Sequence, residues 1–212
     1  YRKDFKAKSD IKRARVYVSA LGIYEMFING KRVGDYLLTP GYTSYGKRNQ
    51  YQTYDVTDML GAENAVGIAL GEGWYVGFSM WQDAYDKEAA AIMQLKIEYA
   101  DGTEEIIKTD DSWKYSTGPV ITSRIYHGET YDATLEHNGW ANFGFDDSVW
   151  NNASVLNRTK STLMAQINEP VAKISEIQPI ELIKTPAGET VVDFGQNLSG
   201  FVRIKVSGSR GS

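Results

Sequence analysis

The residues best suited to chemistry lie near the middle of the chain, where glycines and aromatics alternate ahead of a polar loop. Gly71-Glu72-Gly73-Trp74-Tyr75-Val76-Gly77 is followed by Met80-Trp81-Gln82-Asp83-Ala84-Tyr85-Asp86. A sugar site needs flat aromatic faces that stack on C–H groups and planar polar groups that bind paired hydroxyls. The candidate carbohydrate-binding residues are therefore Trp74, Trp81, Gln82, Asp83, Tyr85 and Asp86. The alternative is structural, with glycines forming a bulge and aromatics filling a core.

Acidic clusters offer a second kind of chemistry. The pairs Asp110-Asp111 and Asp146-Asp147 carry the oxygen ligands that a hard cation such as calcium takes. Asp146-Asp147-Ser148 fits equally well a turn that is capped by its own side-chain oxygens. Residues 127–132 place His127 near acidic residues, but a general acid and base must reach a substrate from two directions. Structural hydrogen bonding is the alternative there.

Other catalytic machinery is missing from the sequence. With zero cysteines there is no disulfide, thiolate metal site or cysteine nucleophile. His127 and His137 are the two imidazoles, and their spacing matches no zinc site. No P-loop, dinucleotide fingerprint or nucleophile elbow occurs either. An independent enzyme is therefore the least favoured interpretation.

The composition is that of a globular chain. Of its 212 residues, 42% are hydrophobic and 24% charged, and 23 Lys plus Arg against 27 Asp plus Glu give a net charge of −4. This balance argues against nucleic-acid binding by bulk charge. The longest uninterrupted apolar stretch, residues 89–93, is too short to cross a bilayer. The chain opens at Tyr1 without an initiator Met or a signal peptide, so we expect it to begin inside a longer protein.

Short β-rich runs must position these groups, because no segment keeps a helical apolar period for several turns. Asn29-Gly30 predicts a hairpin of residues 23–28 and 31–33, and Asp101-Gly102 predicts another of residues 91–99 and 103–109. Further strands are predicted at residues 14–18, 50–56 and 64–70, with one helical turn at residues 57–60. The regular spacing of turn residues favours a β-sandwich of two antiparallel sheets.

The last third of the sequence changes character. Residues 136–157 show no clear period, and we predict a long ordered loop that Trp140 and Trp150 anchor. After Ser161 a second β pattern begins, with strands predicted at residues 173–183, 190–194 and 201–206. We therefore expect a sandwich over residues 1–160. Residues 161–212 would add an edge to it or begin a second β-domain.

Several blocks of the sequence resemble the N-terminal β-sandwich region of bacterial α-L-rhamnosidases. They occur in that family's order over nearly the whole chain. The blocks are Ala14-Arg15-Val16-Tyr17-Val18, Asn29-Gly30-Lys31-Arg32-Val33-Gly34-Asp35, Pro40-Gly41-Tyr42-Thr43-Ser44-Tyr45, Tyr51-Gln52-Thr53-Tyr54-Asp55-Val56-Thr57, Gly73-Trp74-Tyr75, Ile125-Tyr126-His127-Gly128-Glu129-Thr130-Tyr131-Asp132-Ala133 and Phe145-Asp146-Asp147-Ser148-Val149-Trp150. Val192-Asp193-Phe194-Gly195-Gln196-Asn197-Leu198-Ser199-Gly200 is similar to the opening of the family's next β-domain.

The resemblance implies an all-β, galactose-binding-like jelly roll that is not itself catalytic. In that family a C-terminal (α/α)6 barrel hydrolyses the glycoside, and no such helical segment occurs here. The barrel of the same parent chain is thus the expected partner, and the face that meets it should leave an apolar patch. Neither a nucleic-acid nor a membrane partner is expected.

Two functional classes follow from the resemblance. In one, the domain packs against the barrel and frames its active site. In the other it binds terminal L-rhamnose on glycans, because in some family members this module holds the sugar through calcium and an Asp-Asn pair. Here the loop reads Asp83-Ala84-Tyr85, which leaves Asp83 as the candidate metal ligand. Alanine supplies no oxygen ligand, so we favour the structural class, with no required cofactor and calcium as the candidate ion.

Overall fold

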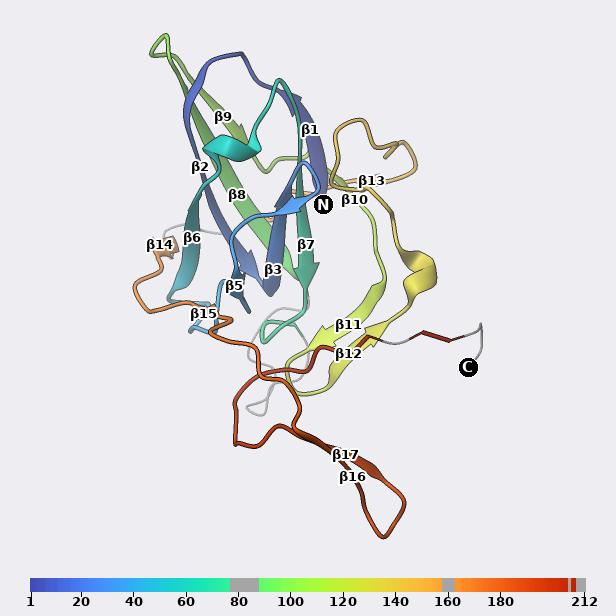
Figure 1. Ribbon diagram of the computed structural model, residues 1–212. Coiled ribbons are helices and arrows are strands. Elements are labelled where there is room, and N and C mark those ends of the chain that lie inside the picture. Colours follow the sequence, from blue (N-terminus) through green and yellow to red (C-terminus); the bar gives the residue numbers. More distant parts are fainter. Residues whose placement is uncertain (77–87, 158–162, 206, 209–212) are drawn as a thin grey trace. The chain divides into compact units, whose positions relative to one another are not determined.

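The computed structural model of the chain describes residues 1–76, 88–157, 163–205 and 207–208 (Figure 1). Within these ranges nearly all regular structure is β, and the helical residues form two short turns, η1 (Thr57–Met59) and η2 (Ala133–Leu135). The predicted all-β class is therefore confirmed. None of the helices in these ranges is long and apolar enough to cross a membrane.

The chain divides into two compact units, Tyr1–Ala172 and Lys173–Ser212. The division falls later than the boundary that the sequence suggested near residue 160. Its position follows from two short strands, because β14 (Leu163–Ala165) pairs with β6 (Asn49–Asp55), and β15 (Val171–Ala172) pairs with β5 (Tyr36–Leu37). These residues thus add edges to the first unit.

Two sheets form the sandwich of the first unit (Figure 1). One has the order β13-β10-β1-β7-β3-β4 and the other the order β14-β6-β2-β8-β9. The first sheet consists of β1 (Arg2–Lys6), β3 (Ile23–Ile28), β4 (Lys31–Arg32), β7 (Glu63–Gly71), β10 (Lys114–Tyr115) and β13 (Asn151–Asn152). The second consists of β6, β14, β2 (Ile11–Leu21), β8 (Ala90–Tyr99) and β9 (Glu104–Lys108). All pairings within them are antiparallel except β14 with β6, which is parallel.

Alternating side chains build the core between the sheets. On β2 Val16 and Val18 are buried while Arg15 faces solvent, as the period of two in a strand requires. β8 contributes Met93, Leu95 and Ile97 in the same way. The opposite sheet supplies Met26, Ile28, Val66 and Ile68 to the same cluster. Burying each such side chain contributes about 1.5–3 kcal/mol, so this cluster provides the main stabilisation of the unit.

Both predicted hairpins are present. β3 and β4 pair through Ile28 and Lys31, and the intervening Asn29 and Gly30 have φ of 51° and 74°. Those left-handed conformations suit Asn and Gly, which explains why the dipeptide specifies the turn. β8 and β9 form the second hairpin, in which Gly102 has a φ of 83°.

Residues 136–157 form the expected long connection, interrupted by the short strand β13. Trp140 lies on β7, where a Cβ at Gly67 would come within 2.5 Å of its ring, and it contacts Phe27 edge to face. Trp150 is buried against Phe145, with ring centroids 5.6 Å apart. The two tryptophans therefore act as anchors, as predicted, and Trp140 covers part of the outer face of the first sheet.

A buried arginine also fixes this connection to the sandwich. The Arg2 side chain is 1% exposed and forms ion pairs with Asp4 and Asp147. It also donates hydrogen bonds to three carbonyl oxygens, those of Trp140, Asn142 and Phe145, at 2.8, 3.1 and 3.4 Å. A planar guanidinium can satisfy so many acceptors at once because its donors point outward in a fixed fork. Arg2 thereby joins β1 to residues 140–147.

A chain of hydrogen-bonded polar side chains, buried at Tyr24 and Gln52 and half-buried at Gln166, joins β3, β6 and the segment that follows β14. The Tyr24 hydroxyl donates to Gln52 Oε1 at 2.7 Å, and Gln52 Nε2 donates to Gln166 Oε1 at 2.9 Å. Desolvation of this site raises the pKa of the Tyr24 hydroxyl, so it stays a proton donor. The network fastens residue 166 to β3 and β6 within the first unit.

The second unit has a single pair of strands among its described residues, β16 (Glu181–Lys184) and β17 (Thr190–Asp193). Of the longer strand predicted at residues 173–183, only the last residues are in a strand, as part of β16. The strand predicted at residues 201–206 is absent from the described residues 201–205. A strand exists only where a neighbour pairs with it, and residues 201–205 pair with no described segment. Composition alone therefore overestimated the strands of this unit.

Candidate carbohydrate-binding site

Trp74 is the one predicted site residue that falls in the described part of the chain. It follows β7 in a turn formed by residues 72–76, where Tyr75 and Val76 N–H groups donate to Glu72 O at 3.2 and 3.3 Å. The other candidate residues, Trp81, Gln82, Asp83, Tyr85 and Asp86, lie outside the described residues. Their grouping with Trp74 into one site, and the metal role of Asp83, stay predictions.

The glycines around this turn permit a close approach of the backbone to neighbouring chains. Gly73 has a φ of 58°, and a Cβ there would lie 2.7 Å from Ile23 Cγ2. A Cβ at Gly71 would lie 2.7 Å from Ser123 Oγ. These positions require glycine for packing and conformation, so the glycines have a structural reason independent of any ligand.

Aromatic rings extend from the interior to the surface beside the turn. Tyr75 and Tyr45 are buried and meet at a centroid distance of 5.1 Å in a T-shaped contact. The centroid of the Tyr42 ring lies 6.0 Å from those of Tyr45 and Trp74, and Tyr42 is 57% exposed. The buried pair confirms the core interpretation for Tyr75. The exposed Tyr42 ring beside half-buried Trp74 is a face on which a sugar ring could stack.

A charged pair fastens the turn to the next hairpin, formed by β11 (Val120–Arg124) and β12 (Gly128–Tyr131). Arg124 donates from Nε and Nη2 to Glu72 Oε1, both at 3.1 Å. Ser123 N–H donates to the same carboxylate at 3.1 Å, and Glu72 N–H donates to Ser123 Oγ at 3.1 Å. Glu72 is therefore occupied by structural contacts, which explains its place among the glycines and aromatics.

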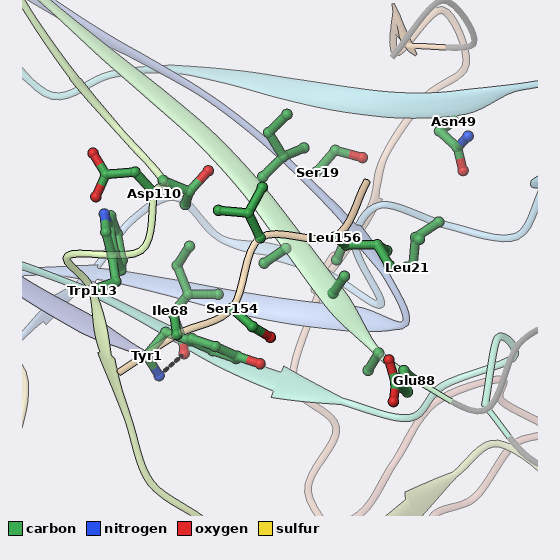
Figure 2. A pocket seen from close by; sticks show the side chains of 18 of the residues that line it. Tyr1, Ser19, Leu21, Asn49, Ile68, Glu88, Asp110, Trp113, Ser154 and Leu156 are labelled. Carbon is green, nitrogen blue, oxygen red and sulfur yellow. Dashed lines mark hydrogen bonds between the residues drawn. The ribbon is translucent and has the colours of Figure 1, made fainter. Parts of the chain in front are cut away.

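A separate pocket of about 350 Å³ opens where β2 ends and β8 begins (Figure 2). Tyr1 and Trp113 provide aromatic walls, and Ser19, Glu88 and Ser154 are among its polar lining residues. The pocket has the size of small-molecule sites, but Trp74 does not line it. The sequence analysis did not predict this pocket. Its lining includes Ala89, Ala90 and Ala91 around the start of β8, and their small side chains leave space there.

Short aspartate-capped turns account for three of the acidic residues that the sequence singled out, Asp110, Asp132 and Asp146. In each, the carboxylate accepts a hydrogen bond from the backbone N–H of a Ser or Thr two residues later, at 2.8–3.1 Å. These Asx-turn aspartates are Asp55, Asp101, Asp110, Asp132 and Asp146. The hydroxyl of the same Ser or Thr is the main cause that lowers the pKa of each carboxyl group.

This pattern accounts for one aspartate in each of two clusters. Asp146 caps a turn, as the structural interpretation proposed, while its neighbour Asp147 pairs with Arg2. Asp132 caps η2 through Thr134, so it is committed to structure rather than aimed at a substrate. Across the described ranges, no three His, Asp or Glu side chains converge in a way that could hold a metal ion.

Comparison with known proteins places these features in a family context. Residues 9–175 match the alpha-L-rhamnosidase N-terminal domain, and residues 183–212 match the bacterial alpha-L-rhamnosidase concanavalin-like domain. An alpha-L-rhamnosidase of Formosa agariphila is 37% identical over 100% of this chain and 23% of its own length.

Solved structures agree with the sequence comparison. The alpha-L-rhamnosidase of Aspergillus terreus matches with a TM-score of 0.87 and 40% identity over 93% of this chain and 23% of that one. The Streptomyces avermitilis enzyme, solved in complex with L-rhamnose, matches with a TM-score of 0.86 and 39% identity over 93% of this chain and 20% of its own. The present chain thus spans less than a quarter of the length of these proteins.

Proposed function

Because this chain belongs to the alpha-L-rhamnosidase N-terminal domain family, we propose that it is a non-catalytic accessory domain of an α-L-rhamnosidase. Its partner is the C-terminal catalytic barrel of the same parent chain. The observation that carries this proposal is the family match over residues 9–175, combined with a span of only 20–23% of the matched rhamnosidases. Most of each relative, including room for a catalytic domain, lies outside the matched region.

The side chains of the first unit support a non-catalytic role. Glycoside hydrolysis needs a pair of carboxyl groups that face each other across the scissile bond. The Asx-turn aspartates cap turns, Asp147 pairs with Arg2, and Glu72 binds Arg124. These carboxylates are therefore committed to the scaffold.

The second unit supports continuation into a further domain. Every described residue of this unit is at least partly exposed, and its apolar side chains have no core of their own. Leu182 and Val192 pair on one face of the β16–β17 hairpin, and they are 69% and 43% exposed. An isolated two-stranded hairpin is at best marginally stable in water. The concanavalin-like domain that this segment matches would supply the missing strands.

The test is to assay glycoside hydrolysis in this chain and in the complete parent protein. The expected result is rhamnose release from an aryl α-L-rhamnoside by the parent protein and none by the 212-residue chain. Turnover by the 212-residue chain at a rate comparable to the parent would overturn the non-catalytic role.

A second candidate function is binding of terminal L-rhamnose. It is favoured by one feature, the exposed Tyr42 ring beside Trp74, and the Streptomyces avermitilis relative was solved with this sugar. Calorimetric titration of L-rhamnose, with and without calcium, separates the two functions. Saturable heat that is lost in Tyr42→Ala would support the binding function, and calcium-dependent heat that is lost in Asp83→Ala would support a metal at Asp83. No heat under either condition leaves the accessory role alone.

A further inference from the structure

We infer that the hairpin arm, residues 120–136, is the surface by which this domain docks on the part of the rhamnosidase chain that lies beyond these 212 residues. The arm comprises β11, β12 and η2. The inference rests on the proposed function and deepens it, because it assigns the contact to one element of the fold.

The arm has apolar side chains and no interior. None of its residues is buried, and in Figure 1 it extends from the end of β7 outside both sheets. Its large exposed apolar residues are Val120 (43%), Ile121 (52%), Tyr126 (63%), Tyr131 (50%) and Leu135 (44%). A hairpin of two strands needs packing against another element for independent stability. Some other part of the protein must therefore cover it.

The arm is nevertheless held in a defined position. Gly73 N–H donates to Ser123 O at 3.0 Å, and the Glu72 carboxylate binds both Ser123 N–H and the Arg124 guanidinium. These contacts lie at the turn end of the hairpin, next to the connection between β11 and β12, and they use backbone groups and polar side chains. A surface that is ordered before binding loses less conformational entropy on docking, which favours a stable contact.

Length and charge indicate what covers the arm. The matched rhamnosidases extend far beyond this chain, which spans only 20–23% of their length. The arm carries three exposed carboxylates: Glu129, Asp132, which also caps η2, and Glu136, which also accepts a hydrogen bond from the Tyr131 hydroxyl. Its one guanidinium, Arg124, is paired with Glu72. The occupant is therefore a surface of the parent chain with an apolar centre and basic residues around it.

The experiment compares amide hydrogen exchange of the arm in the 212-residue chain and in the complete parent protein. Exchange of the β11 and β12 amides should slow by about tenfold or more in the parent, because docking suppresses local opening. The variant Ile121→Asp should lower the melting temperature of the parent by about 3 °C. In the 212-residue chain it should have no larger effect than its control.

Ile106→Asp is the matched control. Ile106 is also 52% exposed, but it lies on β9, whose neighbour Ile107 already packs on the core of the sandwich. Tyr126→Ser provides a milder second variant of the arm, since Tyr126 lies in the turn between β11 and β12. In the parent protein, both arm variants should lower the melting temperature by more than the control does. In the 212-residue chain, all three variants should lower it by the same amount.

Three outcomes would overturn the inference. Equal exchange of the arm in both proteins would show that the parent chain does not cover it. Strong protection already in the 212-residue chain would assign the cover to residues of this chain, or to a second copy if the protection rises with concentration. Equal effects of Ile121→Asp and Ile106→Asp in the parent would contradict docking at the arm. Rhamnosidase activity of the parent, measured in parallel, tests the proposed function separately.

Discussion

Replacing Arg2 by methionine should destabilise the first unit, because this guanidinium is a buried cation that holds residues 140–147 against β1. The side chain is 1% exposed and contacts the carboxylates of Asp4 and Asp147. Methionine retains much of the apolar volume of the arginine stem, so little of the loss should come from a cavity. The experiment therefore isolates the charge and the hydrogen bonds.

The expected magnitude follows from what the substitution leaves behind. Removing one partner of a buried ion pair costs about 3–5 kcal/mol. The carboxylates of Asp4 and Asp147 are 30% and 25% exposed, so water partly solvates them once the cation is gone. The three carbonyl groups that accept from Arg2 lose partners as well, at roughly 1 kcal/mol for each that stays buried. We expect a loss of about 3 kcal/mol in the free energy of unfolding.

Urea unfolding followed by tryptophan fluorescence measures this loss. With a denaturant slope of about 2 kcal/mol per molar, the midpoint should fall by roughly 1.5 M. Arg13→Met is the control, because the Arg13 side chain is 45% exposed and pairs with Glu98 at 2.8 Å on the surface. Its midpoint should hardly move, since exposed ion pairs add little. Arg2→Lys keeps the charge without the planar fork, so its urea midpoint should lie between those of the unchanged protein and of Arg2→Met.

A loss below about 1 kcal/mol for Arg2→Met would refute this reasoning, because it would place the pair among ordinary surface pairs. Equal midpoint shifts for Arg2→Met and Arg13→Met would do the same. A full loss in Arg2→Lys would show that geometry, rather than charge, carries the interaction.

Three further predictions concern packing, the buried polar chain and pH. Gly67→Val should destabilise the first unit by about 2 kcal/mol, since its Cβ would lie 2.5 Å from a carbon of the Trp140 indole ring. Gly61→Val is the control and should not destabilise the unit, because no atom lies within 4 Å of a Cβ there. Equal melting temperatures of the two variants would contradict this prediction. Gln52→Leu leaves the Tyr24 hydroxyl and the Gln166 amide without their partner, so the midpoint of urea unfolding should fall by the equivalent of about 1–3 kcal/mol. Proteolysis near residue 166 should become faster, and an unchanged rate would argue against a role of Gln52 in fastening that segment. The pKa of each Asx-turn aspartate is lowered in the folded state by Ser or Thr hydroxyl hydrogen bonds, so the stabilisation is present above the unfolded pKa, about 4, and is lost as the pH falls below it. Urea midpoints at pH 7, 5, 4 and 3 should therefore decline mainly between the last two, and a decline already complete at pH 5 would be inconsistent.

Local physics made several elements predictable from the sequence. Asn29-Gly30 and Asp101-Gly102 specify hairpins because those residues adopt positive φ with little strain. Alternation on β2 predicts its buried face, since successive side chains point to opposite sides of a strand. The Asx turns could have been predicted as well, because each follows an Asp-x-Ser or Asp-x-Thr pattern.

The candidate site was predictable only in part. The glycines and aromatics around Trp74 do gather in one turn, but Gly73 meets Ile23 and Tyr75 meets Tyr45 in contacts between distant segments. Those contacts determine which aromatic rings are buried and which stay available for stacking. Sequence spacing carries no information about them, so the roles of Tyr42 and Tyr75 became distinct only in the folded chain.

By itself, the sequence determined the all-β class, the main hairpins and the turns, all of which depend on interactions between residues close in the chain. Tertiary structure alone decided that Arg2 is buried, although it stands beside Tyr1 and Lys3 in a charged segment, since its partner Asp147 is 145 residues away. It also decided that β7 is covered on both faces and that residues 120–136 form an arm outside the sheets. Burial and pairing depend on what packs against a segment, and that is set by the whole chain rather than by its neighbours in sequence.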